Sequence, residues 1–140
     1  MLKILIVDDN LGWRNFNKSS IEAIFGDEAE ITLAESARDG YDKVMFAGKE
    51  KFDLIISDLQ MESDFAPVIA GEWFVRQVLT FPRYKTSEIL LVSAMYNIEM
   101  ISDMLGVDCL SKRLLISGSE LPLQLKLEEM GYKIPQNGKG

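Results

Sequence analysis

Three aspartates stand directly after apolar runs, and this placement suggests a shared site. Asp8 and Asp9 follow the run 2–7, and Asp58 follows the run 52–57. The first run is too short to span a membrane and too apolar for a half-exposed strand, which is typical of a buried parallel strand. Parallel strands point the same way, and open α/β folds place their ligands at the carboxyl ends. We therefore expect the three carboxylates to meet there and to bind a divalent metal ion.

Strand-like runs alternate with helical patterns along the chain, and no internal repeat or low-complexity block interrupts them. This order predicts an α/β fold with a doubly wound, five-stranded parallel sheet and helices on both faces. The expected strands cover about residues 2–7, 29–34, 52–57, 88–93 and 107–110. A helix is expected after each strand, and a long loop from Asp58 to about Ile69 precedes the third.

Polar residues at the expected helix starts indicate where these helices begin and which side faces the core. Asn10 and Ser36 suit N-cap positions, and Ser119 suits the start of the last helix, where Pro122 is tolerated in the first turn. The residues expected to face inward are Tyr41, Val44 and Met45 in the second helix and Leu121, Leu125 and Met130 in the last, with Leu123 and Leu127 beside them.

Length and composition indicate one globular domain. A chain of 140 residues is large enough to bury roughly 70% of the surface that it exposes when unfolded. Its apolar content of 47%, with 10 Gly and 4 Pro, argues against a disordered or fibrous chain. We assign residues 1–130 to the domain and residues 131–140 to a short, frayed C-terminal tail.

Charge and residue usage exclude several functional classes. The 15 Lys and Arg against 22 Asp and Glu give a net charge of -7, which disfavours binding to nucleic acid or to anionic membranes. The chain has no histidine, so Ser-His-Asp and Cys-His catalysis, histidine metal ligation and a phosphohistidine carrier are excluded. Cys109 is the only cysteine, and no signal peptide or apolar stretch of about 18 residues occurs, so we expect a cytoplasmic location.

Two further residues follow the later strands, and with them the pattern becomes specific. Ser93 and Ala94 come after the fourth expected strand, and Lys112 comes after the fifth. Each motif alone is weak, because acidic pairs and lysines are common in solvated loops. Their joint order closely resembles the receiver domain of two-component response regulators (CheY-like), which has a flavodoxin-like (βα)5 fold. The resemblance spans nearly the whole chain.

The resemblance implies a phosphoacceptor site. The residue that matches Asp58 accepts a phosphoryl group from a partner histidine kinase, and the residues that match Ser93 and Lys112 bind phosphoryl oxygens. This chemistry suits the residue types, since phosphoryl transfer depends on positioning and on neutralising the equatorial oxygens. Lys112 adds a mobile point charge and Ser93 a hydroxyl donor. Ala94 is small and leaves the acceptor accessible.

The same resemblance implies that Mg²⁺ is the metal. Magnesium prefers oxygen ligands and keeps several waters, so one or two carboxylates, a carbonyl and a phosphoryl oxygen suffice. We expect Asp9 and Asp58 to be direct ligands and Asp8 to act through water. The family pattern adds the backbone carbonyl of Gln60 as the remaining protein ligand.

Several positions depart from the family pattern. Cys109 stands where most receivers have a Tyr or Phe whose rotation reports phosphorylation, so signalling would depend on Ser93 and backbone movement or on a neighbour such as Tyr96. Arg113 stands where proline is usual. A cis peptide before a non-proline residue costs about 2.5–4 kcal/mol, so the Lys112–Arg113 bond is either trans or held cis as strain in the site.

The loop after Asp58 is also longer than usual, up to Gly71. Glu62 and Asp64 add negative charge there, which would slow attack by anionic donors. The apolar stretch 65–70 is either a docking element for a specific partner or an idle surface loop. The sequence leaves both readings open.

These observations predict a single-domain response regulator that signals by protein contact and is not a turnover enzyme. Its expected partners are a sensor histidine kinase or phosphotransfer protein and a downstream target, with the output face at about residues 96–130. A homodimer linked to phosphorylation is an open alternative. Two other functions compete: an interaction module that acts without phosphorylation, and a small Mg²⁺-dependent phosphohydrolase with an aspartyl nucleophile. The phosphohydrolase normally has an Asp-x-Asp motif after its first strand, whereas this chain has Asp8-Asp9-Asn10.

Overall fold

A sheet of five parallel strands forms the centre of the computed structural model, which describes residues 1–61 and 70–135. The strand order is β2-β1-β3-β4-β5, and all neighbouring pairs are parallel. The chain therefore changes direction across the sheet between β1 and β3, which makes their carboxyl ends the topological switch point. The predicted fold class is confirmed. The strands are β1 (Leu2–Val7), β2 (Ala29–Ala34), β3 (Leu54–Ser57), β4 (Ile89–Ser93) and β5 (Asp108–Ser111).

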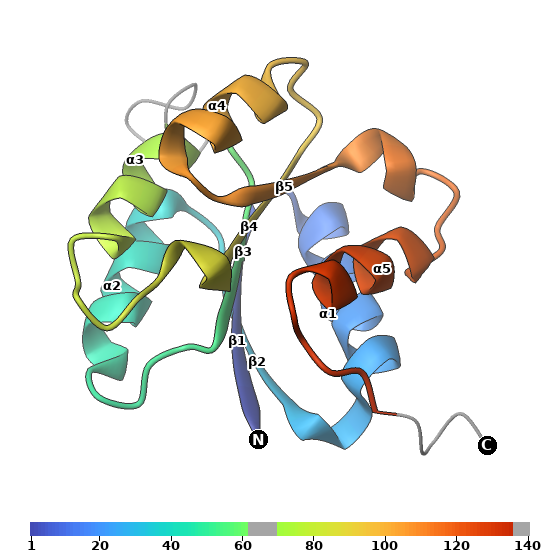
Figure 1. Ribbon diagram of the computed structural model, residues 1–140, viewed down its shortest axis with the longest axis horizontal. Coiled ribbons are helices and arrows are strands. Elements are labelled where there is room, and N and C mark those ends of the chain that lie inside the picture. Colours follow the sequence, from blue (N-terminus) through green and yellow to red (C-terminus); the bar gives the residue numbers. More distant parts are fainter. Residues whose placement is uncertain (62–69, 136–140) are drawn as a thin grey trace.

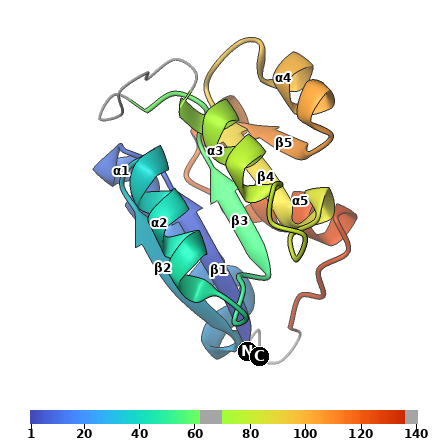
Figure 2. The same ribbon diagram turned by 90° about the vertical axis from the view of Figure 1, so that its left-hand side faces the viewer.

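Helices cover both faces of the sheet (Figure 1). One face carries α2 (Ala37–Ala47), α3 (Ala70–Val78) and α4 (Ile98–Leu105), and the other carries α1 (Leu11–Phe25) and α5 (Leu121–Glu129). Figure 2, turned by 90°, shows α2 and α3 lying in front of the strands. None of the helices in the described ranges combines the length and the apolar character that crossing a bilayer requires. Short 3-10 helices lie at η1 (Gly26–Glu28), η3 (Thr86–Glu88) and η4 (Lys112–Leu115).

Alternate side chains of each strand enter two separate cores. In β1, Leu5 and Val7 pack under α2, α3 and α4, whereas Ile4 and Ile6 pack under α1 and α5. All four side chains are at most 1% exposed. Burial on both faces explains why the central strands β1, β3 and β4 are almost continuously apolar, whereas the edge strands β2 and β5 contain polar residues.

Two of the three predicted helix caps are confirmed. Ser119 is not the N-cap of α5, because that position is taken by Glu120, although the Ser119 hydroxyl accepts the Leu121 N–H at 3.1 Å. The side-chain oxygen of Asn10 accepts the Trp13 N–H at 2.9 Å and starts α1. The Ser36 hydroxyl accepts the Asp39 N–H at 2.9 Å and starts α2. Each cap satisfies a backbone donor that the first turn of a helix leaves without an internal partner. The first cap also fixes the start of α1 two residues after the acidic pair.

The predicted inward side of two helices is wrong. In α5, Leu123 and Leu127 are fully buried, whereas Leu121 and Leu125 are 52% and 55% exposed. Leucine at every second position gives two equivalent pairs four residues apart, so the pattern alone could not choose between them. In α2, Met45 is 53% exposed. It follows the buried Val44 directly, and successive helical residues point about 100° apart.

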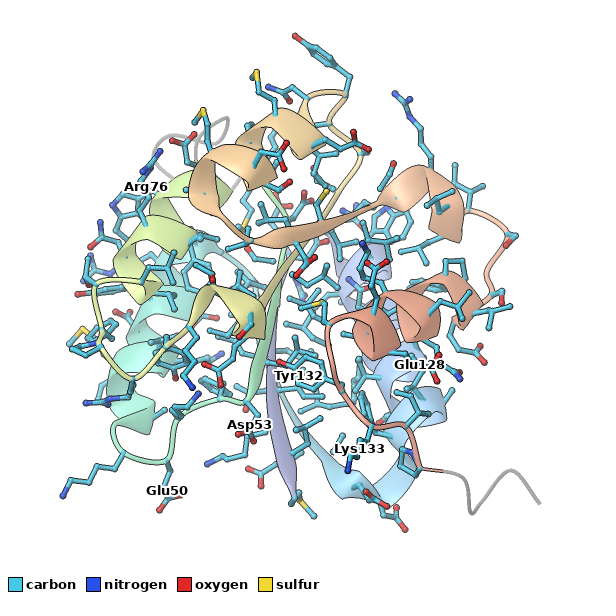
Figure 3. All side chains as sticks on the ribbon, viewed as in Figure 1. Glu50, Asp53, Arg76, Glu128, Tyr132 and Lys133 are labelled. Carbon is cyan, nitrogen blue, oxygen red and sulfur yellow. The ribbon has the colours of Figure 1, made fainter. Side chains whose placement is uncertain are left out.

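The predicted fraying of the tail is wrong for residues 131–135. The Tyr132 hydroxyl donates a hydrogen bond to the backbone carbonyl of Asp53 at 2.7 Å, and Figure 3 shows the two residues at the amino end of β3. Ile134 is only 9% exposed and joins the core under α1 and α5. This segment therefore packs back onto the sheet. Residues 136–140 lie outside the described residues.

Candidate acidic site at the carboxyl edge of the sheet

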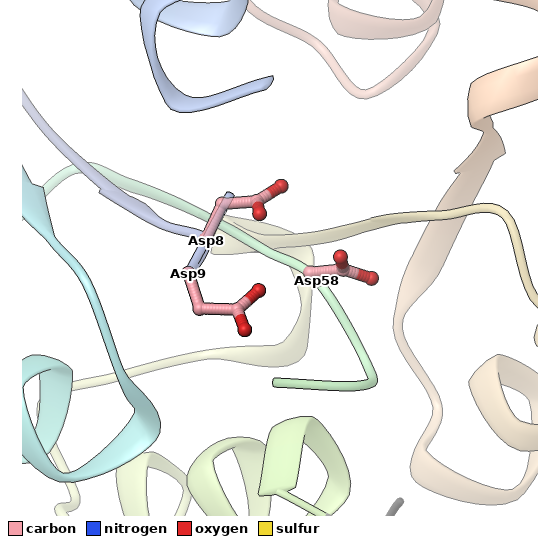
Figure 4. Close-up of side chains that lie close together, drawn as sticks. All are labelled: Asp8, Asp9 and Asp58. Atoms are coloured by element: carbon pink, nitrogen blue, oxygen red, sulfur yellow. The ribbon is translucent and has the colours of Figure 1, made fainter. Parts of the chain in front are cut away.

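The three predicted aspartates meet at the carboxyl edge of the sheet. Val7 and Ser57 are paired in register, so the next residues, Asp8 and Asp58, leave neighbouring strands at the same level. One carboxylate oxygen each from Asp8, Asp9 and Asp58 lies within 4.8 Å of the others (Figure 4). The predicted convergence is confirmed, and the cluster offers only oxygen ligands.

Lys112 bridges two of these carboxylates. It is the first residue after β5, and its Nζ lies 2.9 Å from Asp8 Oδ2 and 2.8 Å from Asp58 Oδ2. The side chains of all three residues are at most 10% exposed. One ammonium thus compensates two buried carboxylates, which leaves a local excess of negative charge suited to a cation.

Burial disfavours the charged form of Asp8. Desolvation raises the pKa of the Asp8 carboxyl, and the negative charge of Asp58 raises it further. The Lys112 ammonium lowers the pKa, as does the backbone N–H of Asn10, which donates to Asp8 Oδ1 at 2.9 Å. Desolvation is the largest of these effects, so the net pKa lies above its ordinary value.

Close backbone packing holds the Asp58 region in place. The Asp58 N–H donates to the Val7 carbonyl at 3.0 Å, and the Gly71 N–H at the start of α3 donates to the Leu59 carbonyl at 2.8 Å. A Cβ on Gly71 would lie 2.2 Å from the Asp58 carbonyl oxygen and 2.5 Å from Leu59 Cα. The close approach of α3 to the acidic residue therefore requires glycine at position 71.

A pocket of about 320 Å³ opens beside Asp58. Ser93, which is 1% exposed, lines it, and its Oγ accepts the Met95 N–H at 3.2 Å. The structure thus gathers at this edge every residue that the sequence predicted for the site. The lining residues are Asn10, Trp13, Asp58, Gln60, Ser93, Ala94, Met95 and Lys112.

The backbone is similar to solved structures of response regulators. The chemotaxis protein CheY4 of Vibrio cholerae matches with a TM-score of 0.72 and 26% sequence identity, covering 93% of this chain and 98% of that chain. By its fold the chain is a CheY-like receiver domain. The likeness supports a response-regulator role for this receiver.

Two further solved structures show the same fold. The phosphorylated cyanobacterial phytochrome response regulator RcpA has a TM-score of 0.76 at 17% identity, over 96% of the receiver and 99% of that chain. The Mn²⁺-bound form of response regulator Rcp1 has a TM-score of 0.70 at 16% identity, over 96% and 99%. No protein-family model matches the sequence, and neither does any curated protein.

Two residues of the receiver site were missed by the sequence analysis. The Lys112 Nζ lies 4.8 Å from the centre of the Trp13 ring, and the Arg14 Nη1 donates to the Asp8 carbonyl at 2.8 Å. Both residues lie in the first turn of α1, directly after the acidic pair. Their position in the turn that leaves the carboxyl edge was the signal that could have identified them.

The departures from the family pattern have different outcomes. Cys109 is half-buried on the edge strand β5 and packs against the core under α2, α3 and α4. The described residues contain no cis peptide bond, so the Lys112–Arg113 bond is trans. Tyr96 is 88% exposed, and whether it reports phosphorylation stays a prediction.

The interpretation of the long loop also stays a prediction. Glu62 and Asp64 lie outside the described residues, as does the stretch 65–69. The structure describes the two anchors of this segment. Met61 is fully buried and Ala70 is 4% exposed.

Proposed function

We propose that this receiver accepts a phosphoryl group on Asp58 from a sensor histidine kinase or a phosphotransfer protein and then signals by contact with a downstream protein. The observation that carries the proposal is the environment of Asp58. Its carboxylate faces a pocket, lies 2.8 Å from the Lys112 ammonium and shares a cluster with two other aspartates. A nucleophilic carboxylate with cationic support is what phosphoryl transfer requires.

We further propose Mg²⁺ as the metal ion of this site. The cluster supplies only carboxylate oxygens, which suit a hard divalent cation. Asp9 and Asp58 would be direct ligands, Asp8 would act through water, and the Gln60 carbonyl would complete the protein ligands. Rcp1, a protein of the same fold, has been solved with Mn²⁺ bound. When bound, the cation would neutralise negative charge on the carboxylates and on phosphoryl oxygens.

The chain's own residues would carry the transfer in the following way. An Asp58 carboxylate oxygen attacks phosphorus, the bond from phosphorus to the donor atom breaks, and the donor leaves with the electron pair. Lys112 exchanges its contact with Asp58 Oδ2 for a phosphoryl oxygen, and the Ser93 hydroxyl donates to another. In the later hydrolysis, a water oxygen attacks phosphorus, the bond from phosphorus to the Asp58 oxygen breaks, and Asp58 leaves as a carboxylate while inorganic phosphate is released.

We propose that this hydrolysis is slow and that the protein is a switch, not a turnover enzyme.

An output surface on α4 and α5 is supported by large apolar side chains that are at least half exposed there. Contact with the target, or self-association on phosphorylation, would cover them. A cytoplasmic location follows from the proposed kinase partner and from the lone cysteine. The exposed side chains are Met100, Met104, Leu121 and Leu125.

The intact mass of the protein after incubation with acetyl phosphate and Mg²⁺ tests the proposal. The wild type should gain one phosphoryl group, with release of acetate, and chelation of the metal should prevent the gain. Asp58→Asn should gain none. Asp53→Asn is the matched control, because Asp53 lies directly before the amino end of the same strand, β3, and it should be phosphorylated like the wild type.

Two results would contradict the proposal. If the wild type gains no phosphoryl group and does not bind beryllofluoride, the chain is better explained as an interaction module that acts without phosphorylation. Steady turnover of p-nitrophenyl phosphate would instead indicate a phosphohydrolase.

A further inference from the structure

A closed ring of contacts joins Trp13 to the acidic site. Asp8 Oδ1 accepts the backbone N–H of Asn10 at 2.9 Å, and Asn10 Oδ1 accepts the backbone N–H of Trp13 at 2.9 Å. The Trp13 ring centre lies 4.8 Å from Lys112 Nζ, which returns to Asp8 by donating to Oδ2 at 2.9 Å. The first turn of α1 and the Lys112 ammonium are therefore both tied to Asp8, and the indole ring of Trp13 lies against the ammonium.

The indole ring of Trp13 gives the Lys112 ammonium a favourable contact that replaces part of its lost hydration. The Lys112 side chain is 6% exposed, so its charge has lost most of its hydration. The negative face of an indole ring is the strongest aromatic partner for a cation, and its effect increases when the cation is desolvated. The indole ring is itself supported by the Phe16 ring, which meets it edge to face with 5.6 Å between the ring centres. Trp13 is thus a fixed wall of the pocket.

We propose that Trp13 is a positioning residue that holds the Lys112 ammonium beside Asp58 while the phosphoryl group arrives. This inference rests on the proposed phosphoacceptor function. Lys112 must release carboxylate oxygens of Asp8 and Asp58 when these turn to a metal ion and to a phosphoryl group. Its contact with the Trp13 ring uses no carboxylate oxygen and survives that exchange. The ring therefore keeps the ammonium within reach of the new phosphoryl oxygens.

The contact has a spectroscopic signature that does not depend on phosphotransfer. The chain has two tryptophans, and the second, Trp73, lies on α3 against Tyr41 at 5.6 Å. In Trp73→Phe, Trp13 is the sole tryptophan and should report movement of Lys112. We expect its emission to change when Mg²⁺ and then beryllofluoride are added. The emission of Trp73 in the Trp13→Phe protein should stay constant, and the response of Trp13 should disappear in Trp73→Phe combined with Lys112→Met.

The rate of phosphorylation by acetyl phosphate gives the decisive test. We expect Trp13→Leu to slow it about tenfold, because the ammonium loses its aromatic contact, and Trp13→Phe to restore most of the rate. In a double-mutant cycle, Trp13→Leu should have no further effect once Lys112 is replaced by Met. The unfolding midpoint of each variant, measured in parallel, identifies loss of fold. If Trp13→Leu does not fold, the emission experiment still decides.

The outcomes separate this inference from the proposed function. If Trp13→Leu is phosphorylated at the wild-type rate, the role of Trp13 is overturned and the proposed phosphoacceptor function stands. Persistence of the tenfold slowing in the Lys112→Met background would also overturn it, because Trp13 would then act through another group. Absence of phosphorylation in every protein, the wild type included, would overturn both.

Discussion

The two edges of the sheet treat their polar groups differently. At the amino edge, the Asp53 carboxylate accepts the Lys3 N–H at 2.8 Å, and its carbonyl accepts the Tyr132 hydroxyl at 2.7 Å. In each of these bonds, a side-chain group pairs with a backbone group. At the carboxyl edge, Asp8 and Asp58 share one ammonium. The amino edge is closed by hydrogen bonds, whereas the carboxyl edge retains an excess of buried negative charge.

This difference identifies the carboxyl edge, with its candidate site, as the place where buried polar groups lower the stability of the fold. A backbone hydrogen bond at a strand end satisfies a group that would otherwise be desolvated without a partner. Buried like charges raise the free energy of the folded state unless a cation joins them. Polar groups at the amino edge therefore have their hydrogen-bond partners within the fold, whereas the carboxylates at the carboxyl edge would be stabilised further by a bound cation. Substitutions at the two edges should differ in sign, size and response to metal.

The largest effect should come from Lys112→Met, measured by urea unfolding without Mg²⁺. Two buried carboxylates would lose their ammonium, and removal of one partner of a buried ion pair typically costs about 3–5 kcal/mol of unfolding free energy. Added Mg²⁺ should recover part of the loss. The control is Lys126→Met, whose partner Glu129 is 67% exposed, and which should lose less than about 1 kcal/mol. Equal losses for the two variants would remove the distinction between buried site and surface.

Gly71→Ala should have the next largest effect, because its Cβ would lie 2.2 Å from the Asp58 carbonyl oxygen. The backbone of α3 or of Asp58 must then shift, and we expect a loss of about 2–3 kcal/mol, as for other overpacked sites, together with slower phosphorylation. Gly48→Ala is the control. Its φ of 55° strains alanine but its Cβ would meet nothing within 4 Å, so it should cost about 1–2 kcal/mol and leave phosphorylation unchanged.

At the amino edge, Tyr132→Phe should lose about 1 kcal/mol, the usual contribution of one hydrogen bond. Burial, with smaller effects of the Glu88 and Asp53 charges, raises the pKa of the Tyr132 hydroxyl above its ordinary value of 10.0. The stability that this proton contributes is present below about pH 10 and is lost as the pH rises through the folded pKa. Urea unfolding between pH 9 and 11 should show a larger loss of stability in the wild type than in the variant, which keeps only the contribution of Tyr84, whose pKa is also raised by burial.

Tyr96→Phe is the matched control for that experiment, because Tyr96 is 88% exposed. It should unfold like the wild type at every pH. A similar change in both tyrosine variants would mean that the amino-edge hydrogen bond does not close the fold.

The smallest effect should come from Asp8→Asn, because opposing influences act on Asp8. Its raised pKa, due first to burial, means that the carboxyl group stabilises the fold below its ordinary pKa near 4 and that this contribution is lost as the pH rises through the folded value. Without metal, the variant should therefore lose less stability than the wild type between pH 4 and 7. Asp27→Asn, on the exposed turn η1, is the control. A steeper loss in Asp8→Asn would reverse our reading of the carboxyl edge.

The order of strands and helices could be predicted because burial on both faces makes the three central strands almost continuous apolar runs. The caps of α1 and α2 were also predictable, since Asn10 and Ser36 act on donors within three residues. The inward face of α5 was not, because the alternating leucines fit two orientations. The packing of Ile134 was missed for a related reason, since it depends on a core that distant elements build.

The site could be predicted in part. Asp8, Asp58 and Lys112 follow strands directly, so strand direction alone brings them to one edge. The contact between Trp13 and Lys112 joins a residue that follows the first strand to one that follows the last strand, and no local sequence pattern specifies it. The requirement for glycine at position 71 has the same origin, because it depends on how closely α3 approaches β3.

The anchoring of the chain at Met61 and Ala70 has an evolutionary consequence. Both residues are buried, and Gly71 is tied to the Leu59 carbonyl, so the chain leaves and re-enters the core at fixed points. Between fixed points, doubling the length of a connection adds only about 0.6 kcal/mol of closure entropy. Insertions and deletions between these two fixed points would therefore change the free energy of folding little.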